Sequence, residues 1–170
     1  QAMSPVDCIF LDPARRNEHG GKTVAISDCE PDVAELEELL LNKAGQVMVK
    51  LSPMLDLSLA LKELQHVQEV HIISANNECK ELLLILGQAS VEEISIHCVN
   101  LPTKGTQEEQ HFVFTREQEQ RSECNYTDTL ENYLYEPNAS LLKAGAFRSI
   151  ASAFPVKKLH PNSHLYTSDV

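Results

Sequence analysis

Short apolar runs that end at proline, polar or turn residues recur along the first hundred residues, and helical patterns separate them. Each run is long enough for one buried strand, and several contain β-branched side chains. Strands that alternate with helices over connections of a few residues are typical of βαβ units with a largely parallel sheet. We therefore predict an α/β fold with strands at residues 6–11, 46–51, 69–74 and 92–99.

Three helices are expected between these strands. The first follows Pro31, which suits a first helical turn, and closes at Gly45, which suits a cap at the end of a helix. Leucines spaced three and four apart give it one apolar face. The other two are expected at residues 55–64 and 77–86, the latter closed by Gly87.

The pattern changes after Leu101, where a turn-rich stretch and a polar run follow. We place a domain boundary there, between residues 1–101 and residues 102–170. The second part is expected to be a small α+β region, with a strand at residues 111–114 and one helix at residues 139–154. Residues 116–121 form a charged polar stretch, and the last residues are expected to be a loop and a strand.

Composition bounds the classes of function. The formal net charge of −11 argues against a protein coated with positive charge for nucleic acid, although residues 139–170 carry four basic side chains and one acidic. Five cysteines without a paired spacing predict neither a disulfide framework nor a zinc ribbon. No apolar run is long enough to span a membrane. These features favour a protein of the reducing cytoplasm with no membrane partner.

The residues just after the predicted strands are the first place to look for a site, because ligands of open α/β sheets bind at the carboxyl ends of strands. Asp12 and Pro13 follow the first strand, and a rigid Asp-Pro turn can aim a carboxylate into a crevice. The alternative is a plain turn with solvated arginines, or residues that cap the next helix. The further predicted binding residues at this edge are Arg15, Arg16, Lys50, Ser52 and Asn76.

Other groupings are weaker. His160 and His164 stand four apart, but Pro161 between them disfavours a helix and no third ligand is marked, so no metal site is predicted. The acidic residues 35, 37 and 38 are interpreted as the solvated face of the first helix. Residues inside predicted strands are expected in the core, namely Cys8, His71, His97 and Cys98.

The basic end of the chain interleaves cations with aromatic rings, which is what loop or single-stranded RNA contacts need. The alternative is a helix that packs its rings into a small core with its lysines outside. The predicted RNA-binding residues are Lys143, Arg148, Lys157 and Lys158.

Three blocks of the first part, residues 10–16, 50–56 and 73–81, together with residues 133–146 and 160–166, resemble one family of bacterial enzymes. The resemblance is to the C-terminal part of a class I S-adenosylmethionine-dependent methyltransferase with a THUMP-like C-terminal domain. Asp12-Pro13 takes the place of the motif after the fourth strand, where many amino-group methyltransferases carry Asp-Pro-Pro and an aromatic residue. Here Ala14 and Arg15 follow instead.

This resemblance implies the second half of a Rossmann-like sheet, strands 4 to 7 of the order 3-2-1-4-5-7-6, followed by an incomplete THUMP-like region. It implies methyl transfer to RNA by a parent protein, with Asp12 and the backbone near Pro13 orienting the acceptor. The Gly-rich turn that holds adenosylmethionine in the family is missing, so this chain by itself is expected to bind no cofactor and to be inactive. The alternative is a non-catalytic RNA- or protein-binding module on the same scaffold. A first strand left at the sheet edge also predicts a homodimer through residues 6–11.

Overall fold

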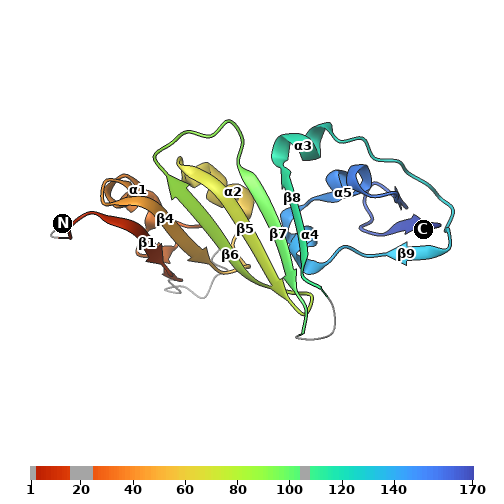
Figure 1. Cartoon of the computed structure of the whole chain (residues 1–170), viewed down its shortest axis with the longest axis horizontal. Coiled ribbons are helices and arrows are strands. Elements are labelled where there is room, and N and C mark those ends of the chain that lie inside the picture. The colour runs from red at the N-terminus through yellow and green to blue at the C-terminus, as the bar shows by residue number, and fades with distance from the viewer. Residues whose placement is uncertain (1–2, 16–24, 104–107) are drawn as a thin grey trace.

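A six-stranded mixed sheet runs through the computed structural model, which describes residues 3–15, 25–103 and 108–170 (Figure 1). Its strand order is β1-β4-β6-β5-β7-β8. β1 pairs with β4 and β5 pairs with β7 in parallel, whereas β6 is antiparallel to both neighbours and β8 is antiparallel to β7. The expectation of a largely parallel sheet was therefore wrong. The strands are β1 (Val6–Leu11), β4 (Ala44–Leu51), β5 (Val67–Ala75), β6 (Glu78–Gly87), β7 (Ser95–Leu101) and β8 (Gln110–Thr115).

The main correction concerns the helix expected at residues 77–86, because strand β6 (Glu78–Gly87) occupies this stretch instead. Asn76 and Asn77 both have positive φ, of 51° and 60°, as the two central residues of a type I′ hairpin turn require. Asparagine tolerates this left-handed conformation better than most residues. β6 then lies between β4 and β5 in the centre of the sheet, and the second half of its apolar run is buried.

Helices α1 (Val33–Leu41) and α2 (Leu57–Glu63) are the two that the sequence predicted correctly in kind. Each starts at an aspartate, Asp32 or Asp56, whose side chain accepts hydrogen bonds from two backbone N–H groups of the first turn. Gly45 does not end α1 as expected. It lies inside β4, which starts two residues after α1's C-cap residue, Asn42.

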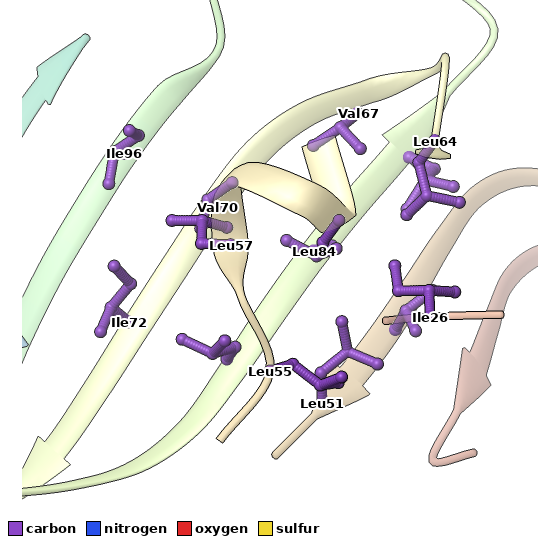
Figure 2. Packing of buried hydrophobic residues seen from close by; sticks show 14 of the residues in the cluster. Ile26, Leu51, Leu55, Leu57, Leu64, Val67, Val70, Ile72, Leu84 and Ile96 are labelled. Carbon is purple, nitrogen blue, oxygen red and sulfur yellow. The ribbon is translucent and has the colours of Figure 1, made fainter. Parts of the chain in front are cut away.

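The core lies between α2 and one face of the sheet (Figure 2). Leu57 and Leu64 from the helix segment belong to the same buried cluster as Val70 of β5 and Leu84 of β6. Fully burying one such aliphatic side chain contributes about 1.5–3 kcal/mol. The fully buried residues of the core cluster with the largest side chains are Tyr166, Ile26, Leu55, Ile72, Leu82, Leu84, Leu86 and Ile96.

The C-terminal part carries a second, three-stranded sheet of order β10-β11-β9 beside the end of the main sheet (Figure 1). Its strands are β9 (Tyr133–Tyr135), β10 (Lys157–Lys158) and β11 (Tyr166–Ser168). The single helix expected at residues 139–154 is two helices, α4 (Ala139–Ala144) and α5 (Phe147–Ala153). Gly145, with φ of 74°, breaks the path in the way that a glycine after a helix commonly does.

The charged stretch at residues 116–121 is helix α3 (Arg116–Arg121), held at its start by a capping box between Thr115 and Gln118. A further two-stranded ribbon pairs β2 (Ala14–Arg15) with β3 (Cys29–Glu30). The predicted strand at residues 111–114 is confirmed as β8, and it forms the last strand of the main sheet. Among the described residues, the helices are all too short or too polar to cross a membrane.

Candidate functional site

A small pocket of about 310 Å³ opens at the carboxyl ends of β1 and β4. Asp12 and Pro13 come from the end of β1, and Lys50 and Ser52 come from the end of β4. The parallel pairing of these two strands brings the four residues to one edge of the sheet. The other lining residues are Ala14, Cys29, Leu51, Pro53, Leu55, Lys80 and Glu81.

Local turns fix the walls of this pocket. Pro13 is buried and lacks a backbone N–H, so β1 ends there and the chain continues into β2. After β4, the Ser52 hydroxyl accepts a hydrogen bond from the backbone N–H of Met54 at 3.3 Å, and the backbone N–H of Leu55 donates to the Ser52 carbonyl at 3.1 Å. Both strand ends are thus held by turn chemistry.

Charge in the pocket is centred on Lys50. Its Nζ lies 2.7 Å from Asp12 Oδ2 and 3.7 Å from Glu81 Oε2, so one ammonium bridges two carboxylates. The hydrogen bond to Asp12 raises the pKa of Lys50 above its usual value, against a smaller opposing effect of desolvation. Asp12 remains more than half exposed and keeps acceptor capacity for a donor in the pocket.

The structure brings together four of the seven residues predicted for the catalytic and substrate-binding edge, namely Asp12, Pro13, Lys50 and Ser52. Arg15 lies in β2, next to the pocket in sequence, and Arg16 lies outside the described residues. Asn76 lies in the turn between β5 and β6, where its Oδ1 accepts from Thr103 Oγ1 at 2.6 Å. It is not among the residues that line the pocket.

Glu81 and Lys80 line the pocket but were not predicted for it. Both belong to β6, which the sequence had suggested to be a helix. The Asn76-Asn77 pair was the signal that could have placed Lys80 and Glu81 in a strand, because a two-residue hairpin turn makes the following residues pair antiparallel with the end of β5.

Each of the four cations predicted to bind RNA is engaged within the chain. Lys143 Nζ donates to the Leu55 carbonyl at 2.8 Å, and Arg148 donates through its guanidinium to the Gln120 carbonyl at 3.3 Å. Lys157 forms an ion pair with Glu131. Lys158 is only 2% exposed and donates to the carbonyls of His160 and Pro161. Burial lowers the pKa of Lys158.

A larger cleft, of about 710 Å³, lies between the main sheet and the C-terminal part. Amide side chains join the two sides: Gln110 Oε1 accepts from Asn100 Nδ2 at 3.0 Å and from Asn138 Nδ2 at 2.9 Å, and Asn77 Oδ1 accepts from the Ala139 N–H at 2.7 Å. Aromatic rings, including Phe112 and Tyr166, line the rest. No sequence motif pointed to this cleft, because its residues come from six separate segments.

The two histidines that were expected in the core lie on the half-exposed face of the sheet instead. His71 in β5 and His97 in β7 are paired in register and their rings stack at 4.4 Å between centroids. His111 of β8 continues the row at 5.5 Å from His97. Desolvation, and next the nearby His71, lower the pKa of His97. Cys98 is buried as predicted, whereas Cys8, on the edge strand β1, is exposed, so that prediction was wrong.

The comparisons with known proteins give two similarities. Residues 133–170 match a family of ferredoxin-like domains. The solved structure of a candidate methyltransferase from Porphyromonas gingivalis W83 matches with a TM-score of 0.85 and 43% sequence identity over 96% of this chain. This chain covers 40% of that protein, so it spans less than half of the neighbour's length. No curated protein matches the sequence.

Proposed function

We propose that this chain is the acceptor-binding part of a class I adenosylmethionine-dependent methyltransferase, with the Asp12 pocket as its catalytic edge. The observation that carries the proposal is the strand order. A class I sheet ends in strands 4-5-7-6 with strand 7 antiparallel, and β1-β4-β6-β5 has this order with β6 antiparallel. Asp12-Pro13 then follows the equivalent of strand 4, where the family's motif lies.

Two further observations support it. Asp12, Lys50 and Ser52 line one polar pocket at the carboxyl edge of the sheet, and the solved neighbour at 43% identity is described as a candidate methyltransferase. In the proposed role, Asp12 accepts a hydrogen bond from the acceptor nitrogen and Lys50 holds the aspartate in place. Orientation of this kind supplies much of the rate when one reactant is already a strong electrophile.

Adenosylmethionine would supply the methyl group, but the pocket residues fit it poorly. The sequence has no Gly-rich turn after a predicted strand to approach its methionine and ribose, and none of the described residues that line the pocket is aromatic and could stack on its adenine. The cofactor is therefore assigned to the parent protein. The ferredoxin-like C-terminal region is proposed to be the THUMP-like part of that protein, and a cytoplasmic location stays a prediction.

The test is methyl transfer by the full-length parent protein, with labelled adenosylmethionine and total RNA. Asp12→Asn is expected to lower kcat/KM about 100-fold, because the acceptor loses its orienting carboxylate. Asp128→Asn is the matched control, since Asp128 is an exposed aspartate that does not line the pocket. Its rate is expected to stay unchanged.

Both variants should have the same melting temperature as the unsubstituted protein, because the Asp12 and Asp128 carboxylates are exposed and contribute little stability. An Asp12→Asn enzyme as fast as the parent would refute the catalytic role of this pocket. A parent that transfers no methyl group but binds RNA would favour the alternative, a non-catalytic module.

RNA is the acceptor that we propose, through the basic C-terminal end. Lys157 is the exposed lysine of that end, and Lys157→Gln in the parent protein is expected to reduce the salt slope of RNA binding by about one. Lys62→Gln, which removes an exposed lysine from α2, should leave the slope as it is. Filter binding over a salt series gives both slopes. Equal salt slopes for the two variants would show that Lys157 does not contact RNA phosphates.

A further inference from the structure

A carboxylate and two imidazoles meet on the half-exposed face of the main sheet, away from the Asp12 pocket. Glu69 and His71 lie two residues apart in β5 and so project from the same face. His97 lies directly opposite His71 in the parallel strand β7. One ligand atom from each of the three lies within 4.8 Å of the others. Glu69 Oε2 is 2.9 Å from His71 Nε2.

We propose that Glu69, His71 and His97 bind a divalent transition metal ion, and that this ion is Zn²⁺. Imidazole nitrogen and carboxylate oxygen are ligands that Zn²⁺ prefers, and two histidines with one acidic residue form a known three-ligand set that leaves a fourth position open. The three donors come from two hydrogen-bonded central strands, so their backbone positions are fixed by the sheet. Small side-chain rotations suffice to bring such atoms to coordination distance.

His111 supports the same site from β8. Its Nε2 lies 3.3 Å from His97 Nδ1, so a hydrogen bond there leaves Nε2 of His97 as the ligand atom. A partner on the second ring nitrogen is the usual way in which a metal-binding histidine is oriented. His111 is therefore a positioning residue. Among the residues that the structure describes, His71 alone of the three stacked imidazoles forms an ion pair, and a metal ion would give His97 a charged partner as well.

The chain gives a matched control for the test. His160 and His164 are exposed histidines outside the sheet, so replacing them removes two imidazoles without touching the proposed site. Cys8 is an exposed thiol that could bind Zn²⁺, and all proteins would therefore carry Cys8→Ser. Calorimetric titration of the metal-free 170-residue chain with ZnCl₂ at pH 7.5 measures the affinity.

The Cys8→Ser chain is expected to bind one Zn²⁺ with a micromolar dissociation constant. His71→Gln with His97→Gln should weaken binding more than about 100-fold, and His111→Gln by about 10-fold. The variant with His160→Gln and His164→Gln should bind Zn²⁺ with the same affinity as the Cys8→Ser chain. Binding should also weaken at pH 5.5, because protons compete for the imidazoles.

A second readout separates binding from damage to the fold. Zn²⁺ should raise the melting temperature of the parent chain and the His160/His164 control, but not that of the His71/His97 variant. Without metal, all of these proteins should melt at similar temperatures. A single-site affinity unchanged by the His71/His97 replacements, or a parent chain that Zn²⁺ neither binds nor stabilises, would overturn the proposal. Because the assay needs no methyl transfer, its outcome is independent of the function proposed for the Asp12 pocket.

Discussion

Replacement of Glu37 by alanine is expected to lower the free energy of unfolding by about 3 kcal/mol. Glu37 is only 5% exposed, although it lies on the helix face that the sequence suggested to be solvated. Its carboxylate accepts hydrogen bonds from the backbone N–H of Gln65 at 3.0 Å and of His66 at 2.8 Å. It therefore fastens α1 to the loop that leads from α2 into β5.

Alanine would leave the two part-buried backbone N–H groups without a hydrogen-bond acceptor. The free-energy cost of leaving a buried donor unpaired is larger than the net stabilisation that one hydrogen bond contributes. Glu37→Gln keeps one acceptor oxygen but brings an amide nitrogen against a second donor, so its cost should be intermediate. Glu38→Ala is the control, because the neighbouring side chain is 80% exposed.

Urea denaturation measures all three variants, and the m-value should stay constant if only stability changes. We expect the midpoint for Glu38→Ala to remain within error of the parent. A Glu37→Ala protein as stable as Glu38→Ala would contradict the claim that this carboxylate holds α1 to the loop.

Glu37 also illustrates what the sequence could and could not predict. Its neighbours Glu35 and Glu38 fit a polar helix face, and composition alone gives no sign that one of the three turns inward to serve backbone donors. The strands at residues 6–11, 46–51 and 69–74 were placed well because apolar runs of that length are typical of buried strands. The local sequence pattern therefore predicted where strands lie, but it did not predict the long-range hydrogen bonds that a polar side chain such as Glu37 forms.

The error at residues 77–86 has a physical cause of the same kind. A short continuous apolar run fits a buried helix and a central strand equally well, and periodicity cannot separate them. The preceding asparagine pair decides the question through its left-handed backbone. With β6 misassigned, the sheet was expected to be largely parallel, and Glu81 could not be placed beside Lys50.

The Asp12 edge was predictable because parallel neighbours end on the same side, whatever lies between them in sequence. The histidine row was not predictable in this way. Its members are 26 and 14 residues apart, and only the register of β5, β7 and β8 brings them together. Their place inside strands suggested burial, but this face of the sheet is half-exposed.

Substitutions in β1 are expected to have the largest effect on the self-association of the chain. β1 is the first strand of the main sheet, with β4 on one side and no strand of the described chain on the other (Figure 1). Val6, Cys8 and Phe10 alternate along its exposed face, and Phe10 is 57% exposed. Lysine, proline and bulges, which discourage edge pairing, do not occur in β1. In the proposed parent protein another strand would pair with this edge.

We therefore expect the 170-residue chain to form a two-fold dimer through β1, and Phe10→Lys to dissociate it. In a two-fold dimer the substitution is present in both chains, so two apolar rings are lost from one interface. We expect the free energy of association to weaken by about 3–6 kcal/mol, which raises the dissociation constant roughly 10²–10⁴-fold. Met54→Lys is the control, since Met54 is also 57% exposed but lies outside β1. Sedimentation over a concentration series should give dimers for the parent and Met54→Lys and monomers for Phe10→Lys. A monomeric parent at high concentration, or a Phe10→Lys chain that still pairs, would mean that this edge is not what joins two copies.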